Sequence, residues 1–229
     1  MCIRDRVEIG CDASASWASR YKHLVSWDSV EKIAQDCTNY TPGKKWTNDN
    51  GTDIHFILTG GEPMLWQRET QELLKQPQFN DLQNLTVETN CTQFFKADFY
   101  RFLQGLVAGD YTKNPVHVTW STSPKLSISG EKWEKAIKPD VAYQYSKKPN
   151  SHLYFKFVIQ DEQDLVEVDK ARELYAKAGV DADIYLMGVG ATQEGQAKTS
   201  RQEADISLQY GYKYSPRLHV DLFGNKWGT

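Results

Sequence analysis

Short apolar runs typical of strands alternate along the chain with segments whose apolar residues recur at helical spacing. The tail of a strand is predicted near Val7, and strands are predicted at 55–59, 85–90, 116–120, 152–159, 183–187 and 217–223. Helices are predicted from a cap at Ser26 or Asp28 through Cys37, and at 67–75, 96–106, 162–178 and 196–209. About five alternations of strand and helix predict an α/β fold with parallel strands and outer helices, which fits a partial (β/α)6-type barrel better than a complete eightfold one.

Polar or glycine-rich clusters follow the predicted strands where they end. The clusters are Thr59 to Glu62, Glu88 to Asn90, Ser123 to Lys125 and Met187 to Gly190. Ligands of parallel α/β folds bind at the carboxyl ends of strands, so these clusters predict one binding edge. Two glycines let the backbone approach a ligand closely, and the Glu62 carboxylate suits an ammonium group. The alternative is an ordinary turn between strand and helix, with Glu62 and Lys125 as surface charges.

Composition narrows the choice of function. The 229 residues carry a formal net charge of -3, which provides no basic footprint and argues against nucleic acid as a partner. No apolar run reaches the ~18 residues of a membrane span, so we expect a cytoplasmic protein with a small-molecule ligand and no membrane partner. Residues 1–6 fit no structural or targeting pattern and are predicted to be a non-native leader, with a single domain over 7–229.

The turn after the strand at 55–59 introduces a family resemblance. Thr59-Gly-Gly-Glu-Pro63 looks like the methionine-amino-group motif of radical S-adenosylmethionine (SAM) enzymes. With Glu88-Thr-Asn, Ser123-Pro-Lys and the closing stretch Arg217-Leu-His-Val-Asp-Leu-Phe-Gly-Asn-Lys-Trp-Gly-Thr229, the chain resembles the 7-carboxy-7-deazaguanine synthase family from about residue 10 to its end. The resemblance implies a radical SAM barrel.

The resemblance also implies roles for individual residues. The SAM cofactor would be bound by Gly60, Gly61 and Glu62 at its amino group, by Ser123, Pro124 and Lys125 at its ribose and carboxylate, and by Met187, Gly188, Val189 and Gly190 at its adenine. Thr59 and the terminal carboxylate of Thr229 would contact the substrate. Cys91, where the family often has glycine, is predicted to be a packed thiol.

A 4Fe-4S cluster is implied as well, because the family holds one with three closely spaced cysteines. Cys11 matches the third of these, whereas Cys2 lies too far upstream. We therefore expect the first strand and part of the cluster loop to be truncated, and this chain to be inactive as written. The family also places a threonine near Mg²⁺ where this chain has Ala13, which leaves Asp12 and Ser14 as the candidate Mg²⁺ ligands.

By resemblance, the reaction is the ring contraction of 6-carboxy-5,6,7,8-tetrahydropterin to 7-carboxy-7-deazaguanine with loss of ammonia, as in queuosine biosynthesis. A SAM-derived radical would do this chemistry, so no protein group is nominated as general base. Flavodoxin or ferredoxin as electron donor and a homodimer are further expectations. Two alternatives stay open: another small radical SAM enzyme, such as a glycyl-radical activating enzyme, and a non-catalytic SAM-binding scaffold that has lost its cluster.

Overall fold

The centre of the molecule is a six-stranded parallel sheet. The structure is a computed structural model that describes residues 19–24, 26–48, 50, 52–190 and 192–224. Its strands are β1 (His55–Leu58), β2 (Asn84–Thr89), β3 (His117–Thr122), β4 (Ser151–Ile159), β5 (Asp183–Gly188) and β6 (Lys213–Tyr214). They lie in sequential order and every neighbouring pair is parallel. The predicted α/β fold, a partial barrel of parallel strands, is therefore confirmed.

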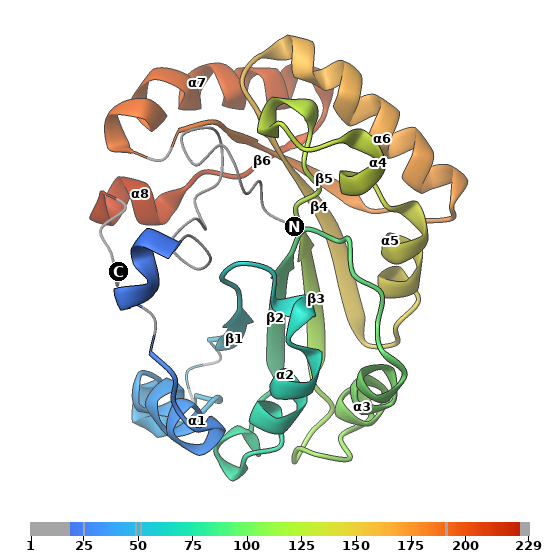
Figure 1. Cartoon of the computed structure of the whole chain (residues 1–229). Helices are drawn as coiled ribbons and strands as arrows, with labels where there is room; N and C mark the ends of the chain where they lie inside the picture. Colours follow the sequence, from blue (N-terminus) through green and yellow to red (C-terminus); the bar gives the residue numbers. More distant parts are fainter. Residues whose placement is uncertain (1–18, 25, 49, 51, 191, 225–229) are drawn as a thin grey trace.

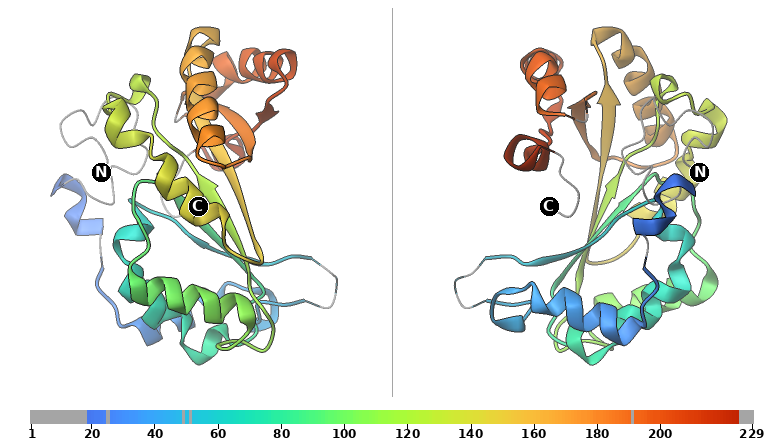
Figure 2. Two further views of the ribbon diagram at one scale, coloured as in Figure 1. Left: turned by 90° about the vertical axis from the view of Figure 1, so that its right-hand side faces the viewer. Right: turned by 60° about the vertical axis from the view of Figure 1, so that its left-hand side comes forward.

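Helices line the outside of this curved sheet (Figure 1), and Figure 2 gives the same arrangement from two other sides. The α-helices are α1 (Val30–Asn39), α2 (Gln67–Leu74), α3 (Ala97–Ala108), α4 (Trp133–Ala136), α5 (Pro139–Ser146), α6 (Leu165–Lys177), α7 (Gln193–Tyr210) and α8 (Leu218–Phe223). Short 3-10 turns occur at Ser19–Leu24, Pro42–Lys44, Pro63–Leu65, Pro77–Phe79, Ser127–Ser129 and Glu162–Asp164. None of the helices within the described residues is long and apolar enough to cross a bilayer.

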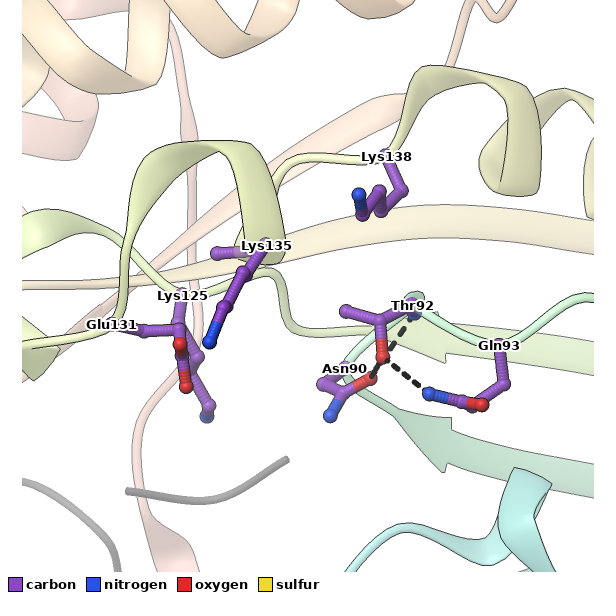
Figure 3. Close-up of a pocket in the computed structure, with 8 residues that line it drawn as sticks. Asn90, Thr92, Gln93, Lys125, Glu131, Lys135 and Lys138 are labelled. Carbon is purple, nitrogen blue, oxygen red and sulfur yellow. Dashed lines mark hydrogen bonds between the residues drawn. The ribbon is translucent and has the colours of Figure 1, made fainter. Parts of the chain in front are cut away.

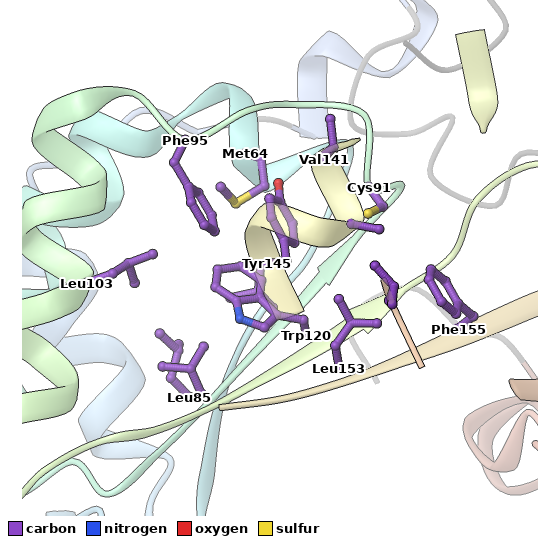
Figure 4. Close-up of a cluster of buried hydrophobic side chains, with 14 of the residues drawn as sticks. Met64, Leu85, Cys91, Phe95, Leu103, Trp120, Val141, Tyr145, Leu153 and Phe155 are labelled. Carbon is purple, nitrogen blue, oxygen red and sulfur yellow. The ribbon is translucent and has the colours of Figure 1, made fainter. Parts of the chain in front are cut away.

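The main core fills the space between the sheet and its helices (Figure 4). In β2, Leu85 and Val87 alternate with half-buried polar residues, so one face of the strand packs and the other stays open. Trp120 and Tyr145 are fully buried and their ring centroids lie 4.6 Å apart. Burying each such side chain contributes roughly 1.5–3 kcal/mol, so this packing fixes the sheet against its helices.

The structure differs from the predictions at the predicted strand 217–223, which is helix α8 instead. Only Val220 of this helix is buried, while Leu218 and Leu222 are exposed at a spacing of four residues. Gly224, at φ 64°, ends the helix in the left-handed conformation. Apolar residues at every second position mimicked a strand, and the sixth strand is the short β6 that precedes this segment.

Other predicted boundaries moved by local capping. Ser29, and not Ser26 or Asp28, caps α1 because its side chain accepts a hydrogen bond from the Lys32 amide. Thr192 caps α7, which therefore begins at Gln193. Helices α4 and α5 were not predicted, although α5 buries Val141, Ala142 and Tyr145. The predicted strand tail near Val7 lies outside the described residues.

Candidate functional site

The carboxyl ends of the strands form one edge of the sheet, and the predicted polar clusters lie there. Thr59 to Glu62 follows β1, Ser123 to Lys125 follows β3, and the other two clusters lie at the ends of β2 and β5. The placement of all four clusters on one edge is confirmed by the parallel pairing of β1 to β5. The strand ends and the loops that follow them form the rim of the sheet.

The turn after β1 depends on its two glycines. Gly60 and Gly61 have φ values of 86° and 58°, which side chains rarely tolerate. The Glu62 side chain then accepts a hydrogen bond from the Met64 amide at 3.0 Å and caps the short 3-10 turn Pro63–Leu65. The sequence thus produces a tight turn whose carboxylate points back into the protein.

Glu62 connects the loop after β1 to the loop after β2. Its Oε1 accepts a 2.6 Å hydrogen bond from the Thr89 hydroxyl, and its Oε2 accepts a 2.7 Å bond from the Asn90 amide. The residue is 5% exposed, so the alternative that it is a surface charge is wrong. Burial raises the pKa of the Glu62 carboxyl, while the hydrogen bonds from Thr89, Asn90 and Met64 oppose that shift. About one of the four acceptor positions of this carboxylate is left for a ligand.

A backbone hydrogen bond connects the loop after β3 to the end of β2. The Ser123 amide donates a 2.7 Å hydrogen bond to the Thr89 carbonyl. Beside this bond, Asn90 and Lys125 line a cavity of about 190 Å³ together with Thr92, Gln93, Glu131, Lys135, Ala136 and Lys138 (Figure 3). The lysines give the cavity a positive character suited to an anionic group. Sequence reasoning found Lys125 but missed Lys135 and Lys138, because α4 and the start of α5 were not predicted.

The rim at the end of β5 is arranged differently. Met187 lies on the open face of the strand, whereas Gly188 lies on the opposite, buried face against α7. A Cβ at Gly188 would lie 1.6 Å from Glu203 Oε2, so this glycine makes room for a buried glutamate. Burial raises the pKa of Glu203, with Thr199 and the charge of Arg217 opposing the shift. Gly190, at φ 124°, has its carbonyl bound by the Gln196 amide group at 2.7 Å.

The concave face of the sheet carries a further polar group. The Thr59 hydroxyl donates to Glu88 Oε2 at 3.0 Å, and Lys156 Nζ lies 3.4 Å from Glu88 Oε1. These side chains come from the loop after β1, from β2 and from β4. The predicted substrate residue Thr59 is therefore held in a chain of polar contacts.

The predicted metal ligands Cys11, Asp12 and Ser14, and the predicted substrate residue Thr229, lie outside the described residues. Within the described part of the chain, no group of three or more His, Cys, Asp or Glu residues could hold a metal ion. Cys91 is fully buried in the core, as predicted for a packed thiol, and burial raises its pKa. Core side chains therefore enclose this thiol and leave no space beside it for an iron–sulfur cluster.

Comparison with known proteins supports the resemblance. The chain is 28% identical to the 7-carboxy-7-deazaguanine synthase of Halobacterium salinarum over 226 residues, which are 94% of this chain and 80% of that protein. It is 27% identical to the 7-carboxy-7-deazaguanine synthase of Pyrobaculum aerophilum over 179 residues, 76% of this chain and 67% of that protein. The resemblance predicted from the rim motifs is therefore confirmed.

Other comparisons add little. No protein-family model matches the chain. Among solved structures, the crystal structure of Streptococcus suis SuiB aligns with 76% of this chain at 12% identity and a TM-score of 0.45. The alignment spans 42% of that structure's chain.

Proposed function

We propose that this chain is a radical SAM enzyme of the 7-carboxy-7-deazaguanine synthase type, a carbon–nitrogen lyase that contracts the ring of 6-carboxy-5,6,7,8-tetrahydropterin. The names of two relatives, which align with 76% and 94% of the chain, support the enzyme type. The pterin substrate is our inference from that type. Cytoplasmic 7-deazapurine (queuosine) biosynthesis, a homodimer and a flavodoxin or ferredoxin electron donor belong to the same proposal.

The joined rim is the observation that carries the proposal. Glu62 holds the loops after β1 and β2 together, and the Thr89 carbonyl holds the loop after β3. A ligand that spans these loops would therefore meet groups already fixed in place, which reduces the entropic cost of binding.

The groups on this rim fit the charged end of SAM. Lys125 would bind the carboxylate of its methionine part beside Asn90, and the free acceptor position of Glu62 would bind its ammonium group. Gly60 and Gly61 would let the cofactor approach the backbone, with Ser123 and Pro124 beside the ribose. Met187, Val189 and Gly190 would line the adenine, whereas Gly188 faces α7 and would contribute through its backbone alone.

The iron–sulfur cluster, unlike SAM, finds no suitable ligands among the described residues. When bound, SAM and a 4Fe-4S cluster would supply the radical chemistry, while the protein binds, orients and shields the reactants. The described cysteines do not fit such a cluster, because Cys91 is buried in the core, Cys37 lies on α1, and neither belongs to a group of three His, Cys, Asp or Glu residues in the described part of the chain that could hold a metal ion. Cys11 remains the proposed ligand, and Asp12, Ser14 and Thr229 remain proposed site residues.

Calorimetry with SAM on anaerobically reconstituted protein tests this assignment. Replacing Lys125 by methionine removes one charge-assisted hydrogen bond and should weaken SAM binding by about tenfold or more. The matched control is Lys113→Met, since Lys113 is an exposed lysine just before β3, at the other edge of the sheet. Equal affinity of both variants and the parent would contradict the proposal.

A further inference from the structure

A lysine interrupts the apolar pattern of β4. Lys156 lies between Phe155 and Phe157, which are 2% and 0% exposed in the core. Because successive side chains of a strand point to opposite faces, Lys156 projects to the concave face of the sheet. Its side chain is only 18% exposed there, so a positive charge is held in a partly enclosed position.

The partner of Lys156 lies two strands away. Its Nζ is 3.4 Å from Oε1 of Glu88 on β2, with β3 between the two strands. In a flat sheet those strands would be about 9.6 Å apart, so curvature and long side chains close the gap. Thr59 donates to the other oxygen of Glu88, Oε2. Because Nζ of Lys156 contacts Oε1, the polar atoms occur in the order Oε2 and Oε1 of Glu88, then Nζ of Lys156.

Stability gives little reason for this pair. Partly buried ion pairs contribute little net stability, since the desolvation of both charges offsets their attraction. A second lysine provides the contrast: Lys213 pairs with Asp183 at 2.5 Å, its side chain is 52% exposed, and both charges remain well hydrated. Glu88 remains 42% exposed beside Lys156, so a ligand on the concave face can reach it.

We propose that the Glu88–Lys156 pair reads the amide edge of the pterin ring, and that Lys156 selects its 4-oxo group. This inference rests on the proposed function and deepens it. A pterin presents, in order, a 2-amino donor, an N3–H donor and a 4-oxo acceptor. The pair presents the complementary order of two acceptors and one donor.

This assignment makes Lys156 a specificity determinant. The ammonium group donates a charge-assisted hydrogen bond to the 4-oxo group, and it also fixes the carboxylate that accepts from N3–H and the 2-amino group. A ring with a weaker acceptor at position 4 loses the contact with Lys156. A ring with a 2-oxo group places an acceptor opposite Glu88 and is rejected by repulsion.

Three air-stable probes separate these contacts: pterin-6-carboxylate, its 4-thioxo analogue and its 2-oxo analogue. The wild-type chain should bind pterin-6-carboxylate best. Lys156→Met should weaken pterin binding by about tenfold or more and should remove the preference for 4-oxo over 4-thioxo. The preference for 2-amino over 2-oxo should persist, because it depends on Glu88.

Two further variants control for charge and folding. Lys213→Met removes a lysine from the same row of the sheet, since Lys156 pairs with Tyr185 and Tyr185 pairs with Lys213 in the strand register. It should leave pterin affinity within about twofold, as expected for a surface charge. Lys156→Arg keeps the positive charge and should retain the 4-oxo preference.

The outcomes distinguish the two proposals. If the wild type binds pterin-6-carboxylate but Lys156→Met keeps the full 4-oxo preference, the role of Lys156 is wrong and the proposed function stands. A loss of pterin affinity in Lys213→Met equal to that in Lys156→Met would also overturn the role of Lys156, because the change in net charge would explain both losses. If the wild type binds SAM but none of the pterins, the proposed substrate and the role of Lys156 both fail.

Discussion

The two ends of the rim each bury a glutamate, and they hold it differently. Between β1 and β3, Glu62 accepts hydrogen bonds from three groups on two loops. At β5, neither oxygen of Glu203 accepts a hydrogen bond of normal geometry from the described residues. Burial raises the pKa of both. The burial of a glutamate therefore does not by itself identify a binding loop. The hydrogen-bond donors around its carboxylate show which loops the glutamate holds in place.

The largest effect should come from crowding the β5 end. In Gly188→Ala the new methyl group would overlap the Glu203 carboxylate, and Glu203 is only 1% exposed and has little room to move. We expect a loss of about 3 kcal/mol in the free energy of unfolding, measured by urea denaturation.

A double mutant identifies the cause of that loss. In a Glu203→Ala background the same glycine substitution should cost much less, because the overlapping group is gone. Gly60→Ala at the other end is the matched control, since a Cβ there meets nothing within 4 Å and only its φ of 86° opposes it. Equal costs of Gly188→Ala in both backgrounds would refute the overlap.

Glu62→Gln should have the next largest effect. An amide has one acceptor atom and one donor atom, so either orientation places an N–H group opposite a donor from Thr89, Asn90 or Met64. We expect about 2 kcal/mol of destabilisation in urea. A neutral result would mean that these hydrogen bonds do not hold the rim loops together.

Glu203→Gln should have the smallest effect and the opposite sign. A carboxyl whose pKa is raised by folding binds its proton more tightly in the native state, so its favourable contribution is complete below the unfolded pKa and is lost as pH rises through the folded pKa. The neutral amide avoids that loss. The variant should be slightly more stable than wild type at pH 8 and should lose the advantage near pH 4 in thermal unfolding. A variant less stable at pH 8 would show that Arg217 holds the charged form.

The sequence predicted the parallel sheet and the rim because these depend on local patterns. Apolar runs identified β1 to β5, and the polar or glycine-rich clusters after them identified the rim. It could not predict that Glu62 points inward, since the orientation of a turn side chain depends on donors 27 and 28 residues away. The sequence pattern also mistook α8 for a strand, because its six residues of mixed polarity fit both the two-residue period of a strand and the 3.6-residue period of a helix.

The sequence also could not predict which side chains pair across the sheet. Lys156 and Glu88 are 68 residues apart and meet only because the sheet curves. The available signal was the charge itself, placed inside the apolar run Leu153 to Ile159. A charged residue at such a position predicts an inward-facing partner without identifying it.

Amide hydrogen exchange with and without SAM tests most directly whether the three joined loops form one cofactor site. We predict slower exchange together in residues 59–64, 89–93 and 123–126, with no change at 147–152, which lie at the amino end of β4. Protection of one loop alone, or protection elsewhere with the three loops unchanged, would contradict the assignment of the rim as the SAM site.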